Sequence, residues 1–333
     1  MSDRRKRLGW PVAIAAAVAA GVAATVWVVV VADPAGRTGS GLSKEFAYDT
    51  TALRRVDPAL ILFRPADEIA TGFAEARALA VGADGRVYAA GDRAVRIFTA
   101  AGDRAGEIAL DAPPRALAVD EAAALYIAMA DRIEVYTSYG KRTASWPSRG
   151  ERAVLTSVAV SPTEVFVADA GKREVLRYDK MGQLLGILGH RDADRGVLGI
   201  IVRGPYLDVA TAPDGLVRVA NSGRMRVEAY YADGRLEFAW GRASMDKIEG
   251  FCGCCNPTDI AVFADGRVAT AEKGIPRVKL YDAHGELLAV VAPPELFDEQ
   301  VVGLDLAIDP AGRILVLDPA TRAIRIFVAK EEQ

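Results

Sequence analysis

The residues of this chain that are best suited to chemistry are three cysteines that lie within four positions of one another. Cys252, Cys254 and Cys255 occur in the stretch FCGCCNP, and they are all the cysteines of the 333-residue sequence. Clustered thiols form disulfides in oxidising compartments, bind soft metal ions as thiolates, or act as redox-active nucleophiles. The segment therefore predicts one of three kinds of site, and the sequence leaves the choice among them open.

Each alternative gives the thiols a different task. In the first, Cys254 and Cys255 form a small disulfide ring that presents an apolar face to a ligand, or Cys252 pairs with one of them and staples the turn. In the second, the cysteines bind zinc or copper, and His190, one of only two histidines, supplies the fourth ligand. In the third, a redox or nucleophilic thiol acts with His190 as its base.

A repeated pattern of short strands indicates which fold positions these residues. Six segments contain an apolar strand, a turn that often carries Asp-Gly, and a second apolar strand, as in RALAVGADGRVYAAGD and TDIAVFADGRVATAEKG. The segments align on Leu79, Leu117, Val158, Val209, Ile260 and Leu306. Units of about 40 residues with four short strands are typical of β-propeller blades. The sequence therefore predicts an all-β, six-bladed propeller over residues 47–333.

The last unit ends after its third strand, IRIFV. We expect Ala59–Phe63 (ALILF), which precedes the first unit, to supply the missing fourth strand. Such an exchange closes the ring and removes two exposed sheet edges.

The stretches VANSGRMRVEAYY and TAEKGIPRVKLYD resemble NHL repeats, whose pattern runs apolar–Ala–Asp–x–Gly–x–x–Arg–apolar. Asn221 and Glu272 stand where that family usually has Asp, and Arg226 and Arg277 stand at its arginine position. The third unit carries Glu174 where Arg is expected. The resemblance implies a six-bladed fold of the NHL type, and it implies no chemistry, because propellers of this kind include enzymes and plain binding scaffolds.

Two of the predicted connections between blades are longer than the others, and we expect both to rise over the same face. They are residues 189–205 and 241–257, and the second contains the cysteines. Loops of this length in a compact domain are more often functional than idle. Glu272 and Lys273, in the second-to-third loop of the same blade as the cysteines, should reach the same face, and Asn256 lies beside the thiols. The candidate ligand-binding residues are therefore Asn256, Glu272 and Lys273, together with Asn221, Arg226 and Arg277 of the NHL-like motifs.

The amino-terminal region predicts a membrane anchor. Residues 8–32 contain no charged side chain and are long enough to cross a bilayer as a helix. The basic residues of segment 1–7 keep that segment in the cytoplasm. Residues 33–46 are typical of a flexible linker, and the propeller is then extracytoplasmic, in the periplasm or on the cell surface. A cleaved signal peptide is the alternative.

Composition excludes several classes of function. Forty-one basic and 44 acidic residues give a net charge of −3, which provides no reason to expect nucleic acid as a partner. Two histidines exclude a propeller lyase with a three-histidine zinc site. Asp208, Asp259 and Asp305 could form a partial acidic ring for calcium, although caps of strand entrances are the simpler interpretation.

We therefore favour a membrane-tethered binding or scaffold module with an unknown protein or small-molecule ligand. The alternative is an exported metal-binding or redox protein or enzyme centred on the three cysteines and His190.

Overall fold

The computed structural model describes residues 14–16, 18, 21, 54–191 and 198–331, and the chain divides into two units, residues 1–52 and 53–333. The predicted anchor at 8–32 and the linker at 33–46 fall almost entirely outside the described residues. Among the residues that are described, none of the helices combines the length and apolar character that a membrane span requires.

The second unit is a β-propeller with six four-stranded antiparallel sheets, as predicted. Blade 1 comprises β2 (Ala76–Val81), β3 (Val87–Gly91), β4 (Ala94–Phe98) and β5 (Arg104–Ala109). Blade 2 comprises β6 (Ala116–Val119), β7 (Leu125–Ala128), β8 (Ile133–Tyr136) and β9 (Arg142–Ser145). Blade 3 comprises β10 (Leu155–Val160), β11 (Glu164–Asp169), β12 (Glu174–Asp179) and β13 (Leu184–Leu188).

The other three blades follow the same plan. Blade 4 comprises β14 (Leu207–Thr211), β15 (Val217–Asn221), β16 (Arg226–Tyr230) and β17 (Leu236–Trp240). Blade 5 comprises β18 (Asp259–Val262), β19 (Val268–Glu272), β20 (Arg277–Tyr281) and β21 (Leu287–Ala292). Blade 6 comprises β22 (Asp305–Ile308), β23 (Ile314–Asp318), β24 (Ala323–Ala329) and β1 (Phe63–Ala70). Short 3₁₀ turns occur at η3 (Pro58–Leu60), η4 (Ser222–Arg224) and η5 (Pro294–Leu296).

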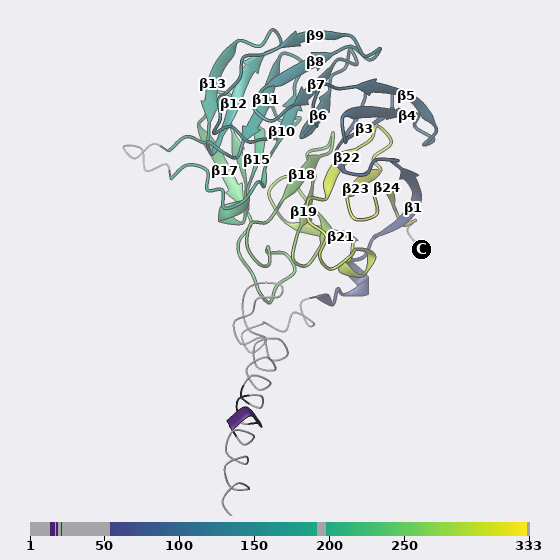
Figure 1. Cartoon of the computed structure of the whole chain (residues 1–333), viewed down its shortest axis with the longest axis vertical. Helices are drawn as coiled ribbons and strands as arrows, with labels where there is room; N and C mark the ends of the chain where they lie inside the picture. Colours follow the sequence, from purple (N-terminus) through teal and green to yellow (C-terminus); the bar gives the residue numbers. More distant parts are fainter. Residues whose placement is uncertain (1–13, 17, 19–20, 22–53, 192–197, 332–333) are drawn as a thin grey trace, which may run out of the picture. The chain divides into compact units, whose positions relative to one another are not determined.

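The ring closes through a strand from the start of the domain, but not through the strand predicted for this role. β1 pairs with β24 along its length, from Phe63 opposite Ala329 to Ala70 opposite Ala323 (Figure 1). The expected closing strand, Ala59–Phe63, was therefore wrong by several residues. Pro58–Leu60 forms η3 instead, because the Asp57 carboxylate accepts a hydrogen bond from the Ala59 amide and Pro58 favours the first position of such a turn.

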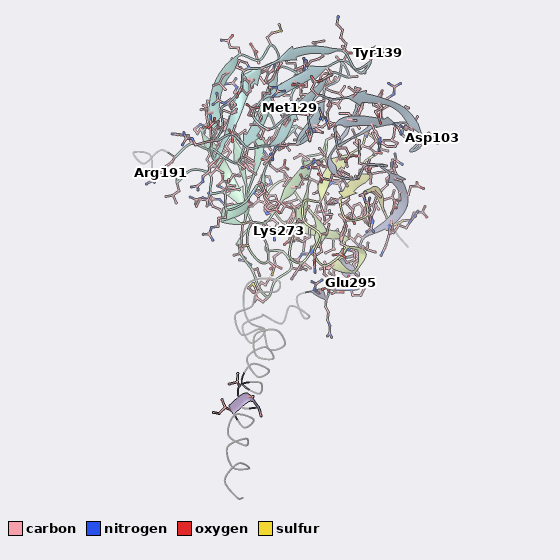
Figure 2. The ribbon with its side chains drawn as sticks, in the orientation of Figure 1. Asp103, Met129, Tyr139, Arg191, Lys273 and Glu295 are labelled. Atoms are coloured by element: carbon pink, nitrogen blue, oxygen red, sulfur yellow. The ribbon has the colours of Figure 1, made fainter. Side chains whose placement is uncertain are left out.

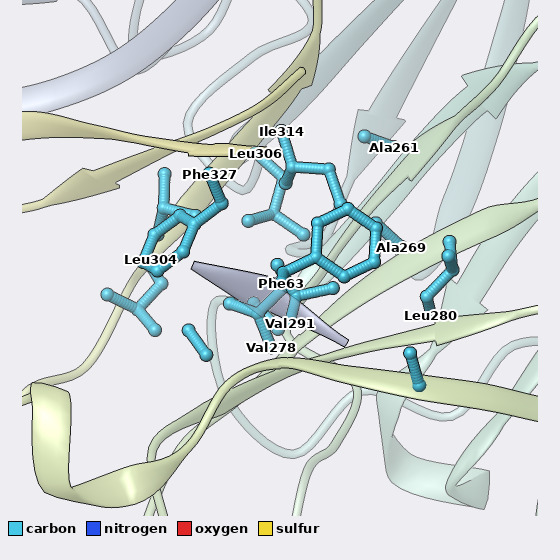
Figure 3. Close-up of a cluster of buried hydrophobic side chains, with 14 of the residues drawn as sticks. Phe63, Ala261, Ala269, Val278, Leu280, Val291, Leu304, Leu306, Ile314 and Phe327 are labelled. Carbon is cyan, nitrogen blue, oxygen red and sulfur yellow. The ribbon is translucent and has the colours of Figure 1, made fainter. Parts of the chain in front are cut away.

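The core consists of six apolar clusters, one between each pair of adjacent blades. Both faces of the middle strands are therefore covered, and all five residues of β3 and of β15 are buried. Figure 3 shows the cluster between blades 5 and 6, where Phe63 of the closing strand lies among Val278, Val291 and Leu306. The outermost strands such as β13 and β17 bury only their last residue.

Tryptophan–glycine contacts join neighbouring blades at the outer strands. Gly285, in the turn between β20 and β21, lies against the ring of Trp240 at the end of blade 4, and Gly182 lies against Trp146 in the same manner. A Cβ atom at Gly285 would stand 2.5 Å from the Trp240 ring. The backbone of Gly285 is also left-handed, with φ +95°.

We expect Gly285→Ala to lower the free energy of unfolding by about 3 kcal/mol, because it combines a left-handed alanine with overpacking. Gly215→Ala is the matched control, since Gly215 has φ +79° and a Cβ atom added there would meet nothing within 4 Å. The control should lose only about 1 kcal/mol, from the left-handed backbone alone. Urea denaturation measures both, and equal losses would contradict a steric role for Trp240.

Candidate functional site

The cysteine segment belongs to the connection between β17 and β18, residues 241–258. Backbone hydrogen bonds from the Phe251 amide to the Arg242 carbonyl and from the Ser244 amide to the Phe251 carbonyl fold it back on itself. Phe251 is fully buried and packs against Trp240 and Tyr281. The connection is therefore anchored in the core at the position just before the cysteines.

A buried lysine binds the backbone of the same connection. Lys279 of β20 has no exposed surface, and its Nζ donates to the carbonyl oxygens of Ile248 at 2.8 Å and Gly250 at 2.7 Å. The ammonium also lies 4.6 Å from the centre of the Phe251 ring. Burial lowers the pKa of Lys279 to about 8, and the negative charge of Glu272 opposes this effect.

Glu272 forms ion pairs with the two positive charges beneath the connection. Its carboxylate accepts hydrogen bonds from Arg277 Nε at 2.8 Å and pairs with Lys279 Nζ at 2.9 Å, and all three side chains are buried. It also accepts a bond from the amide of Cys252 at 3.3 Å. Glu272 and Arg277 are thus paired in the interior of the propeller.

Asn256 joins the cysteine connection to the loop between β19 and β20. Its Nδ2 donates to the Cys252 carbonyl at 2.6 Å and to the Lys273 carbonyl at 3.1 Å, and its Oδ1 accepts from the Lys273 amide at 2.9 Å. Asn256 has no exposed surface. All of these polar contacts fix the backbone, so Asn256 positions Lys273 and the cysteines.

The three cysteines carry free thiols and occupy different surroundings. Cys252 is buried, and its Sγ lies 3.7 Å from the Sδ of Met245. Cys254 is exposed, and its Sγ lies 3.9 Å from Lys273 Nζ. Cys255 is 6% exposed and has a left-handed backbone with φ +65°.

The two buried thiols have raised pKa values. Burial raises the pKa of Cys252, and Arg277 opposes the rise. Burial also raises the pKa of Cys255, and the adjacent Cys254 thiol adds to the rise, while Lys273 and Arg203 oppose it. The exposed thiol of Cys254 is therefore the one that meets solvent.

The first long connection reaches the same site through its carboxyl-terminal end. Tyr206 follows this connection directly, and Lys273 Nζ lies 5.3 Å from the centre of its ring. Burial raises the pKa of Tyr206, and the thiols of Cys255 and Cys254 contribute to the rise. Lys273 thus lies between Cys254 of the second connection and Tyr206, the residue that follows the first connection.

His190, at the opposite end of the first connection, is exposed. Figure 2 shows its neighbour Arg191 at the edge of the propeller, well away from Lys273. Within residues 54–191 and 198–331, no group of three or more His, Cys, Asp or Glu side chains is arranged to hold a metal ion. Zinc or copper binding at the cysteines stays a prediction.

The NHL-like residues of blade 4 also hold a connection in place. Asn221 accepts the amide of Ile201 at 3.1 Å and donates to Glu228 at 2.9 Å. Arg226 Nε donates to the same glutamate at 2.7 Å. Asn221 is therefore to the first long connection what Glu272 is to the second: the residue at the end of the second strand that binds an incoming amide.

Three aspartates meet at the axis of the ring and line a cavity of about 80 Å³. Each accepts a backbone amide from the inner strand of the next blade: Asp208 from Ile260 at 2.6 Å, Asp259 from Leu306 at 2.9 Å and Asp305 from Leu79 at 2.5 Å. These hydrogen bonds join blade 4 to blade 5, blade 5 to blade 6, and blade 6 to blade 1.

The axial carboxyls hold protons more tightly than ordinary aspartates. Burial raises the pKa of Asp208 to about 7 and that of Asp305 to about 6. The pKa of Asp259 is raised well above its usual range by burial and by the charges of its two neighbours. The neighbouring Asp305 carboxyl adds to the rise in the pKa of Asp259.

A larger hollow of about 770 Å³ lies on the opposite face. It is lined by the first-to-second-strand turns of blades 3, 4 and 5, including Ser161, Thr163, Pro213 and Phe263. Sequence reasoning did not indicate this hollow, because its lining comes from ordinary short turns.

Three further residues near the cysteines were not anticipated from the sequence. Lys279 shares one strand face with Arg277 through simple alternation, and this pattern could have identified it. Tyr206 and Arg203 carry no sequence signal beyond their place at the end of a long connection.

Comparisons with known proteins agree with the fold. The structure is similar to a structural genomics protein of unknown function from Bacteroides thetaiotaomicron, with a TM-score of 0.58 and 15% identity over 78% of this chain and 70% of that one. It is similar to a streptogramin B lyase, with a TM-score of 0.57 and 10% identity over 82% of this chain and 100% of that one. It is also similar to a catalytically inactive virginiamycin B lyase from Staphylococcus aureus with quinupristin, with a TM-score of 0.55 and 12% identity over 78% of this chain and 82% of that one.

No family model matches the sequence, and no curated protein matches it. At sequence identities of 10–15%, these similarities support the propeller fold and no shared function.

Proposed function

We propose that this propeller is a binding module whose recognition surface is formed by Arg203, Tyr206, Cys254 and Lys273. The observation that carries the proposal is the meeting of the two longest blade connections at Lys273, which contacts Cys254 Sγ at 3.9 Å and the Tyr206 ring at 5.3 Å. A cationic side chain beside an aromatic ring, with the charge of Arg203 close enough to Cys255 to lower the pKa of that thiol, suits a ligand that presents an anionic group next to apolar surface. The ligand is a protein or a small molecule of that character.

The surrounding structure supports a recognition role. Lys279, Glu272 and Asn256 use their buried polar groups to fix the backbone of this surface. A rigid surface loses less conformational entropy when it binds a ligand. The resemblance of blades 3 to 5 to NHL repeats is consistent with a propeller that serves as a scaffold for such a surface.

We also propose that the module is tethered to a membrane by residues 8–32, with residues 1–7 in the cytoplasm, residues 33–46 as the linker, and the propeller in the periplasm or on the cell surface. The uncharged segment and the basic residues before it support this arrangement. The full chain should stay in the membrane fraction at alkaline pH, and a chain beginning at residue 34 should be soluble. A full chain that is released by alkali would contradict the anchor.

Site-specific photo-crosslinking tests the recognition surface. A photoreactive residue at position 206 should give a defined crosslinked product in cells, whereas one at Thr163, in the hollow of the opposite face, should not. Lys273→Glu, which reverses the charge at the surface, should abolish the product from position 206. A product that forms only from position 163 would move the recognition site to the other face and overturn the proposal.

A further inference from the structure

We propose that Cys254 and Cys255 form a thiol–disulfide exchange site whose substrate is an accessible disulfide. The two thiols lie next to each other in the chain and in space, one exposed and one buried. This activity is separate from the proposed ligand recognition, because it concerns the oxidation state of the two sulfurs.

The position of the pair in the chain favours a reversible bond over a structural one. Adjacent Cα atoms are about 3.8 Å apart across a trans peptide, whereas stable disulfides usually join Cα atoms about 4.4–6.8 Å apart. A bond between neighbours is therefore strained and readily reduced, as exposed and strained disulfides generally are. The backbone of Cys255 is already in the left-handed region at φ +65°, a conformation that is uncommon for residues other than glycine.

The connection does not depend on a disulfide for its structure. Lys279 binds the carbonyls of Ile248 and Gly250, and Asn256 binds the carbonyl of Cys252. These bonds hold both sides of the segment while all three thiols are free. Closing or opening a ring between Cys254 and Cys255 can therefore occur without unfolding the connection.

The two thiols differ in a way that assigns their roles. Cys254 is exposed, and Lys273 Nζ stands 3.9 Å from its sulfur, so the ammonium can pair with a thiolate as it forms there. Cys255 is buried, and burial raises its pKa. Cys254 is therefore the attacking thiol, and Cys255 is the resolving one.

The reaction balances in two steps. The Cys254 thiolate attacks one sulfur of the substrate disulfide, forms a mixed disulfide, and releases the other half of the substrate as a thiol. Cys255 then loses its proton and attacks Cys254 Sγ, which forms the Cys254–Cys255 bond and releases the second half. The substrate gains two electrons and two protons, and the protein dithiol loses them.

Cys252 stands outside this exchange. Its thiol is buried against Met245, and its amide is bound to Glu272. Cys252→Ser therefore provides a matched control that removes one of the three cysteines and leaves the proposed pair intact.

In the test, the reduced protein is treated with oxidised glutathione. The reaction is stopped with acid, free thiols are alkylated, and the mass of the intact protein is measured. In a large excess of oxidised glutathione, which drives formation of a readily reduced bond, the wild type and Cys252→Ser should lose two hydrogens and release two equivalents of reduced glutathione. Cys255→Ser should stop at a mixed disulfide with one glutathione at position 254, and Cys254→Ser should not form the intramolecular bond. Insulin as the substrate, in place of glutathione, distinguishes a protein disulfide from a small one by the relative rates.

A second variant tests the role of the ammonium. Lys273→Met should slow the first step by about fivefold, the factor expected for one charge pair at about 4 Å in water, and Lys247→Met on the same connection should not change it.

The proposal is overturned if the wild type retains three alkylatable thiols, or if peptide mapping finds Cys252 in the bond. Phenylarsine oxide, which bridges paired thiols, should protect Cys254 and Cys255 together in the reduced protein, and this readout does not depend on any variant folding.

Discussion

Lys279→Met is expected to lower the free energy of unfolding by about 3 kcal/mol, since it removes one member of a buried, charged and hydrogen-bonded group. Methionine fills a similar volume but cannot donate to the carbonyls of Ile248 and Gly250, which are 2.8 and 2.7 Å from Nζ. Both oxygens then lose their partner, and the charge of Glu272 is left to Arg277 alone. The cysteine connection should loosen together with the loss of global stability.

Lys330→Met is the matched control for this experiment. Lys330 also donates to one carbonyl, that of Ile61 at 2.6 Å, but its side chain is exposed. Its replacement should change stability by less than about 0.5 kcal/mol. Urea denaturation gives both values, and hydrogen exchange at residues 248–255 reports the loosening. A Lys279→Met protein as stable as the control would show that the connection is held by apolar packing around Phe251.

The blades could be predicted from the sequence because each repeats the same local physics. An apolar strand, a turn with glycine at a left-handed position, and a second apolar strand recur along the chain, as at Asp84-Gly85 and Asp265-Gly266. Both faces of these strands are buried between neighbouring sheets, so their apolar character is continuous. Such a pattern can be identified within one repeat, without knowledge of which distant residues pack against it.

The closing strand could not be placed correctly because we expected it to be apolar. The outermost strands are mostly exposed in every blade except blade 5, and β1, with the sequence FRPADEIA, buries only Phe63 and Ile69. The apolar run Ala59–Phe63 was therefore a poor candidate for that position, although Phe63 does begin the true strand. The exposed pattern of β13 and β17 indicates the same rule.

Part of the candidate site was predictable from connection length, and part was not. The meeting of the two long connections near Lys273 follows from the face on which such loops open. The burial of Asn256 and Glu272 does not follow from it, because a polar residue in a loop looks the same whether it binds ligand or backbone. The positions of Arg277 and Lys279 beneath the connection explain why a charged glutamate is buried there.

The axial aspartates are a further case in which residues far apart in the sequence acquire their chemistry from closure of the ring. Asp208, Asp259 and Asp305 accept amides from the next blade, as strand-entrance caps would. The corresponding positions of blades 1 and 2 are Ala78 and Ala116, so the carboxyls occupy only one side of the axis. Arg115 is the basic residue that lines the same cavity.

Asp259→Asn is expected to stabilise the propeller at pH 8 by about 2 kcal/mol and to change it little at pH 5. The folded protein holds protons on Asp208 up to about pH 7 and on Asp305 up to about pH 6, whereas an unfolded aspartate releases its proton near pH 4. Stability from these groups is therefore complete below about pH 4 and is lost as the pH rises through about 6 to 7. Asparagine keeps an oxygen to accept the Leu306 amide and removes one of the three charges.

Thermal or urea unfolding between pH 5 and pH 8 measures this dependence, and the variant should have the flatter profile. Asp265→Asn, which alters an exposed carboxylate in the turn between β18 and β19, provides the control and should follow the wild type at every pH. If Asp259→Asn destabilises the protein equally at both ends of the range, the contribution of this side chain does not depend on its ionisation, and repulsion at the axis is not the reason for the raised pKa values. A wild-type profile that rises from pH 5 to pH 8 while the variant runs parallel to it would likewise contradict proton sharing among the three blades.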